Sequence, residues 1–113
     1  MEPISTQNAE HYTWGDGCDG WHLVKTPALS VIQERVPPGA FEVRHLHRRS
    51  EQFFFVLGGT ATLEIEGIVH TLGPGEGLHV PAGAAHQLKN DAEVELVFTV
   101  TSTPPSHGDR VVL

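Results

Sequence analysis

The chain of 113 residues has one cysteine, few basic residues and no long apolar run. Cys18 has no partner for an intramolecular disulfide, and a domain of this length can bury a sufficient core without one. No apolar run approaches the ~20 residues that a membrane helix needs, so we expect no membrane segment. Only 7 basic residues oppose 14 acidic ones, and the net charge of -7 argues against nucleic acid as a partner.

Signals for secretion and for several kinds of catalysis are also missing. The first residues lack the basic segment followed by an apolar one that marks a signal peptide, and with the lone cysteine this predicts a cytoplasmic protein. Ser50 and Ser106 lie outside a nucleophile elbow, and no glycine-rich phosphate loop precedes a helix. There is no cysteine pair for a structural zinc.

The distribution of glycine and proline along the chain predicts an all-β domain. The 12 glycines and 8 prolines are spread widely, and no window of helical length is both amphipathic and free of them. Short strands separated by turns fit this pattern better. The expected strands are residues 29–36, 41–47, 52–57, 60–66, 68–72, 77–80, 86–89 and 94–101.

We expect one domain with a short extension at each end. Residues 1–28 are polar and aromatic, and we interpret them as an arm that packs on the body of the domain or on a second subunit. Residues 29–103 form the body. The tail, residues 104–113, is irregular but ends in three apolar residues, and because a disordered tail rarely ends this way we expect it to dock.

Three histidines indicate a metal site. His45 and His47 are one residue apart, so on a strand their side chains point the same way and form a chelating pair. His86 follows a second segment rich in proline and glycine, and a distant strand can therefore supply it. Three imidazoles and one oxygen ligand suit a divalent transition metal, which could be Mn, Fe, Co, Ni, Cu or Zn.

These residues belong to two motifs that resemble those of the small single-domain cupins. The first, G-x5-H-x-H-x(3,4)-E-x6-G, is met by Gly39, His45 and His47, and then by Glu51 with Gly58 or, with a substitution, Gln52 with Gly59. The second, G-x5-P-x-G-x2-H-x3-N, is met in full by Gly75, Pro81, Gly83, His86 and Asn90. The resemblance implies a double-stranded β-helix, the jelly-roll or cupin barrel. It also implies one metal inside, held by the motif histidines and the residue at the motif carboxylate position.

The fourth metal ligand is either Gln52 or Glu51. Neighbours on a strand face opposite sides, so only one of them can enter the barrel. The downstream stretch resembles the cupin pattern in which the ligand lies seven residues before the second glycine of the turn, which favours Gln52. Three neutral imidazoles and a neutral amide would leave the charge of the metal uncompensated, so we expect the site to favour an anionic substrate such as a carboxylate, enolate or dicarbonyl.

The same alternation suggests pocket and interface residues. With Gln52 inward, Phe54 and Val56 also face the interior, while Phe53 and Phe55 face outward, where a second subunit of a homodimer would cover them.

Two further polar residues are candidates for substrate contact. Arg35 and Gln33 share one face of their strand, although the sequence does not tell which face that is. Among the remaining histidines, His107 has the best claim to the site, because its tail could close over the mouth of the barrel. No residue stands out as a general base.

The sequence supports two functional hypotheses. The first is a metal-dependent enzyme that acts on a small oxygen-rich molecule, such as a carboxylate, enol, dicarbonyl or sugar derivative, as a dioxygenase or as an isomerase or lyase. The second is a non-catalytic, metal-containing sensor or binding protein. They differ in the interior, since an enzyme should place an acid, a base or an arginine within reach of the metal, whereas a sensor can have purely apolar walls.

Overall fold

The computed structural model describes residues 2–113 and contains, within them, eleven strands and no helix, so the all-β prediction is confirmed. Over the same residues there is accordingly no helix long and apolar enough to cross a membrane. The strands are β1 Glu10–Trp14, β2 Cys18–Lys25, β3 Ser30–Val36, β4 His45–His47, β5 Glu51–Gly58, β6 Ala61–Ile65, β7 Ile68–Leu72, β8 Gly77–Val80, β9 His86–Lys89, β10 Leu96–Thr103 and β11 Arg110–Val112.

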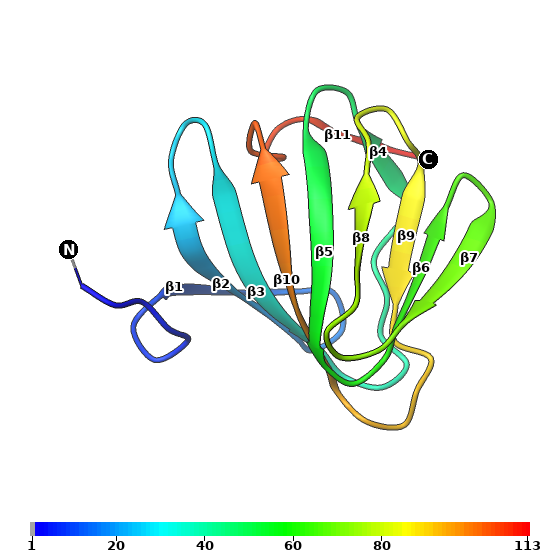
Figure 1. The fold of residues 1–113 in the computed structure, drawn as a ribbon, viewed down its shortest axis with the longest axis horizontal. Coiled ribbons are helices and arrows are strands. Elements are labelled where there is room, and N and C mark those ends of the chain that lie inside the picture. The colour runs from blue at the N-terminus through cyan, green and yellow to red at the C-terminus, as the bar shows by residue number, and fades with distance from the viewer. Residues whose placement is uncertain (1) are drawn as a thin grey trace.

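The strands form two antiparallel sheets (Figure 1). The six-stranded sheet has the order β1-β2-β3-β10-β5-β8, and the five-stranded sheet has the order β11-β4-β9-β6-β7. The chain passes from one sheet to the other after β3, β4, β5, β7, β8, β9 and β10, so segments that are distant in the sequence become neighbours. This interleaving brings β4, early in the chain, beside β9 and β11.

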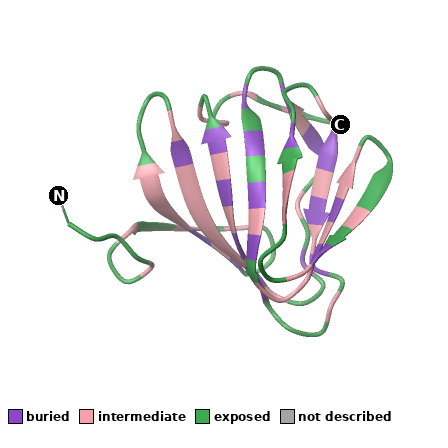
Figure 2. Cartoon of the chain, in the orientation of Figure 1, coloured by how far each residue is buried: buried purple, intermediate pink, exposed green. Residues whose placement is uncertain are grey.

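The apolar core lies between the two sheets. Along β10, Leu96, Phe98, Val100 and Ser102 are buried and the residues between them are half-exposed, as the two-residue period of a strand requires (Figure 2). Leu63 and Leu88 of the opposite sheet are also fully buried. Burying a large apolar side chain such as Phe98 stabilises the fold by about 1.5–3 kcal/mol.

Residues 10–25 of the expected N-terminal arm form two strands of the larger sheet. β2 pairs with β3 from Asp19 opposite Arg35 to Lys25 opposite Ser30, and β1 pairs with β2. Gly15, Asp16 and Gly17 form the turn between these two strands. Residues 2–9 extend away from the two sheets (Figure 1).

The strand expected at residues 41–47 is shorter than predicted. Only β4 is a regular strand, and Phe41 makes a single bridge to Lys89. The tail lies against this strand, because β11 pairs with β4. The carboxylate of Asp109 holds the tail in place by accepting hydrogen bonds from the backbone N–H groups of Arg48, Arg49 and Ser50, at 3.2, 2.9 and 2.8 Å.

The turn after β5 requires glycine at one of its two glycine positions. Gly59 has a φ of 79°, and a Cβ there would overlap the carbonyl oxygen of Glu95. Gly58 has neither constraint, since its φ is not positive and a Cβ would meet nothing within 4 Å. The turn therefore needs its second glycine, and Gln52 lies seven residues before it.

We predict that Gly59→Ala destabilises the protein more than Gly39→Ala. Both glycines have a positive φ, of 79° and 84°, which costs an alanine about 1–2 kcal/mol. A Cβ at Gly39 would meet nothing within 4 Å, whereas at Gly59 it meets backbone, so we expect a further loss of about 1–3 kcal/mol there. Urea unfolding measures both, and equal losses would contradict the close approach of the β5–β6 turn to the backbone at Glu95.

Candidate metal centre

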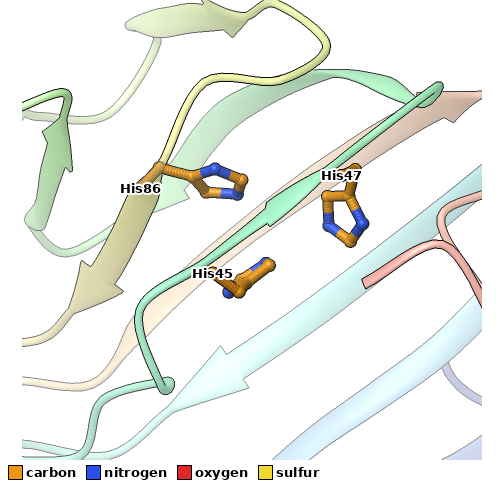
Figure 3. Close-up of side chains that lie close together, drawn as sticks. All are labelled: His45, His47 and His86. Carbon is orange, nitrogen blue, oxygen red and sulfur yellow. The ribbon is translucent and has the colours of Figure 1, made fainter. Parts of the chain in front are cut away.

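Three buried histidines converge between the sheets (Figure 3). His45 and His47 lie on β4, and His86 opens the neighbouring strand β9 directly opposite His45. One ring nitrogen from each residue lies within 4.8 Å of those of the other two. The pairing of β4 with β9 thus brings together the three imidazoles that the motif spacing predicted as ligands.

Backbone carbonyls orient two of these rings. Nδ1 of His45 donates to the carbonyl oxygen of Val43 at 2.7 Å, and Nδ1 of His86 donates to that of Ala84 at 3.0 Å. A carbonyl only accepts, so each Nδ1 carries the proton and each Nε2 keeps its lone pair. This arrangement is typical of metal-ligating histidines, whose second nitrogen is held by a hydrogen bond.

The local environment keeps the three rings neutral. Burial is the main cause that lowers the pKa of all three rings, that of His45 to about 4, and the Arg110 guanidinium acts in the same direction on each. Neighbouring imidazoles also lower the pKa of His45 and His47. At neutral pH the rings are therefore deprotonated, which is the state that binds a metal.

Gln52 and Glu51 occupy opposite faces of β5. Gln52 is buried, and its Nε2 donates to Oγ of Ser102 at 3.0 Å, which leaves the amide oxygen facing the interior. Glu51 is exposed on the outer face, where it accepts a hydrogen bond from Nε2 of His79 at 2.8 Å. Of these two residues, only Gln52 lies in the interior with the three histidines.

The donor set fits a divalent transition metal. Oε1 of Gln52 and Nε2 of His86 are both buried and have no hydrogen-bond partner among residues 2–113. Leaving such an atom unsatisfied costs roughly 1–3 kcal/mol, and a metal bound by these atoms would remove that cost. Three imidazole nitrogens and one amide oxygen are compatible with several first-row metals.

A cavity of about 1070 Å³ reaches His45, His47 and Gln52. Both sheets and the tail contribute to its walls, including Glu34 from β3 and Arg110 from β11. This volume is slightly above the usual range for small-molecule sites, roughly 300–1,000 Å³. The candidate metal site thus opens onto a space large enough for a substrate.

Comparisons with known proteins agree with this arrangement. A family model described as Cupin domain matches residues 32–102, which include all three histidines. The chain belongs to the cupin family. It is 27% identical over 93 residues to the uncharacterised protein MJ1618 of Methanocaldococcus jannaschii, covering 81% of this chain and 74% of that protein.

Solved structures confirm the jelly-roll fold of this cupin. A sugar phosphate isomerase of the cupin superfamily from Silicibacter pomeroyi superposes with a TM-score of 0.79 at 24% identity, covering 88% of this chain and 74% of the other. The polyketide cyclase RemF of Streptomyces resistomycificus superposes with a TM-score of 0.86 at 17% identity, covering 100% and 85%.

The structure corrects part of the expected pocket of this cupin. Phe54 lines the cavity, but Val56 is packed in the core and lies outside the lining. Gln33 and Arg35 are on the other face of β3, where Nε of Arg35 donates to the Asp19 carboxylate at 2.7 Å. The alternation of β3 turns Glu34, between them, toward the cavity.

Sequence reasoning missed the charged residues that line the cavity, among them Glu34, Glu42 and Arg110. Burial raises the pKa of Glu34 to about 8, with a further contribution from Glu42, and burial raises that of Glu42 to about 7. Arg110 lies on the tail strand opposite His47. The signal for Glu34 was its parity with Ile32 and Val36, since a carboxylate among inward-facing apolar positions is unusual.

We predict that Gln52→Ala weakens metal binding and that Glu51→Ala does not. Gln52 is buried and lines the same cavity as His45 and His47, whereas the Glu51 carboxylate is exposed on the other face of β5. Elemental analysis of protein purified without a nickel column measures bound metal per chain. Loss of metal in Glu51→Ala alone would contradict the assignment and shift the ligand by one residue.

Proposed function

We propose that this cupin is a metal-dependent enzyme that moves protons on a small, anionic, oxygen-rich carbonyl compound, in a reaction of the isomerase or lyase type. One observation carries the proposal: the cavity that reaches the histidines is also lined by Glu34, Glu42 and Arg110. A non-catalytic sensor would need only apolar walls and a few hydrogen-bonding groups. Protonatable carboxyls beside a metal site can act as the general acid and general base of a reaction.

The proposed metal ligands are His45, His47, His86 and Gln52. A divalent ion held there would supply Lewis acidity to a substrate carbonyl. Because all four ligands are neutral, the protein leaves the positive charge of the site uncompensated and available to an anion.

Arg110 extends this preference for anions. Its charge lowers the pKa of His45, His47 and His86, so its guanidinium acts on the metal site electrostatically. A guanidinium can also bind a substrate carboxylate through two parallel hydrogen bonds. We therefore propose that Arg110 holds the anionic end of the substrate.

The relatives are consistent with a non-oxidative reaction. Of the two solved structures above, one is named an isomerase and the other a cyclase. A dioxygenase built on the same metal site is the alternative reaction, and a metal-containing sensor is the alternative without turnover.

We predict near-stoichiometric divalent metal in the purified protein and turnover without oxygen consumption. The test combines elemental analysis, an oxygen electrode, and product analysis with a panel of diketones and uronates. Oxygen uptake coupled to substrate loss would replace the isomerase or lyase proposal with a dioxygenase. Bound metal without any turnover would favour the sensor, and failure to bind metal even after reconstitution would contradict the whole proposal.

Arg110→Gln should weaken the binding of an anionic probe to the metal-loaded protein. A hydrogen bond to a charged group contributes about 1.5–3 kcal/mol, so we expect roughly 10- to 100-fold weaker binding of oxalate by calorimetry. Arg48→Gln is the matched control, because Arg48 is exposed and outside the cavity lining. Equal affinity of the two variants for oxalate would contradict the proposed role of Arg110 in anion binding.

We also propose that the protein forms a homodimer through the outer face of the six-stranded sheet. Phe53 is 44% exposed there, and its ring stacks on that of Phe55 with centroids 6.2 Å apart. Leu57, on the same face of β5, is 47% exposed. Covering these neighbouring apolar side chains would favour association.

Phe53→Asp should therefore shift the protein toward a monomer. Ile68→Asp is the control, because Ile68 is 63% exposed on β7 of the other sheet. Light scattering at micromolar concentration gives the mass of each variant. A monomeric wild type would contradict this assembly.

A further inference from the structure

Glu34 and Glu42 reach the same cavity from different sheets. Glu34 lies on β3 of the six-stranded sheet. Glu42 precedes β4 and is bound to β9 of the five-stranded sheet, since its Oε1 accepts a hydrogen bond from the backbone N–H of Leu88 at 2.9 Å. Its own N–H donates to the carbonyl oxygen of Leu88 at 3.0 Å, so Glu42 is held in place beside the strand that carries His86.

We propose that Glu34 and Glu42 are the proton-transfer pair of this cavity, with Glu42 as the base and Glu34 as the acid. This inference rests on the proposed function. It assigns a chemical role to two side chains that line the cavity, one of which is anchored next to the metal ligands.

The surroundings of the two carboxyls favour unequal protonation. Glu34 lies near Tyr12, Trp14 and Cys18, and burial together with the nearby Glu42 raises its pKa to about 8 against the opposing effect of Trp14. Glu42 accepts the Leu88 hydrogen bond and lies in the field of Arg110, and both lower its pKa against the effect of burial. Two carboxyls whose charges interact titrate as a coupled pair, and with pKa values of about 8 and about 7 they hold about one proton between them from pH 7 to 8.

The proposed reaction removes one proton from the substrate and returns one proton to it. The Glu42 carboxylate takes a proton from the carbon beside the substrate carbonyl: the C–H bond breaks, an O–H bond forms, and the electron pair moves into the carbonyl to give an enolate. The Glu34 carboxylic acid then donates its proton to another carbon or oxygen of the same enolate. The pair begins and ends with one proton, and transfer from Glu42 back to Glu34 resets it.

The experiment measures exchange of the methyl protons of pyruvate for deuterium by NMR, using the zinc-loaded full chain. Pyruvate is an anionic carbonyl compound, and its exchange reports proton removal without requiring the natural reaction. The variants are Glu34→Gln and Glu42→Gln, which keep the side-chain shape, and the control is Glu93→Gln, an exposed residue outside the cavity lining.

We expect Glu42→Gln to slow exchange roughly 100- to 10,000-fold, while Glu93→Gln exchanges like the wild type. The wild-type rate should rise as Glu42 ionises and fall as Glu34 loses its proton, which gives a bell-shaped profile with limbs near pH 7 and 8. Glu34→Gln should remove the alkaline limb. A residue with only a structural role would not change the shape of this profile.

Three outcomes would contradict the assignment of Glu34 and Glu42 as the proton-transfer pair. If both glutamine variants exchange as fast as a wild type that is active, the pair is wrong and the proposed function stands. If a variant loses its zinc or unfolds in proportion to its loss of exchange, the residue is structural. If zinc-loaded wild-type protein shows no exchange above the zinc-free protein, the proposed function fails together with the pair.

Discussion

The site depends on the pairing of one three-residue strand with a partner on each side. β4 carries His45 and His47, and its neighbours are β9 and β11. The register with β9 sets His86 opposite His45, and the register with β11 sets Arg110 opposite His47. Both partners come from much later in the chain, so the three histidines and Arg110 meet only when the five-stranded sheet has formed. The Asp109 hydrogen bonds to the loop after β4 fix the same register from the tail.

The two-residue period of strands explains what could be predicted from the sequence and what could not. Spacing within one strand was sufficient to put His45 and His47 on a common face, and the motif around His86 added the third imidazole. The inward face of β3 was harder to assign, because its one signal, the parity of Glu34 with Ile32 and Val36, places a carboxylate among apolar positions. Arg35 was therefore considered for the pocket, while the cavity-facing Glu34 beside it was missed.

The N-terminal strands show the same limit on prediction. The glycines and aspartates around residues 15–20 indicate turns, but the sequence does not tell whether the chain between turns pairs with anything. β1 and β2 gain their hydrogen bonds from β3 and from each other. Such non-local pairing is what single-sequence reasoning handles worst. By contrast, one backbone contact supports the choice of Gln52 over Glu51. Of the two glycines in the turn after β5, only Gly59 must be glycine, and the motif places the ligand seven residues before that glycine, which is Gln52.

Because the proposed metal ligands are all neutral, the carboxyls of the cavity remain available for proton transfer. A carboxylate bound to a divalent ion has its pKa pulled far down and is a poor base near neutral pH. With Gln52 at the ligand position, no glutamate is used in that way by the proposed set, and Glu34 and Glu42 keep a raised pKa in the adjacent space. An anionic substrate entering this space would raise their pKa further, because like charges disfavour ionisation. Arg110, whose charge lowers the pKa of Glu42, counters that effect at the proposed base.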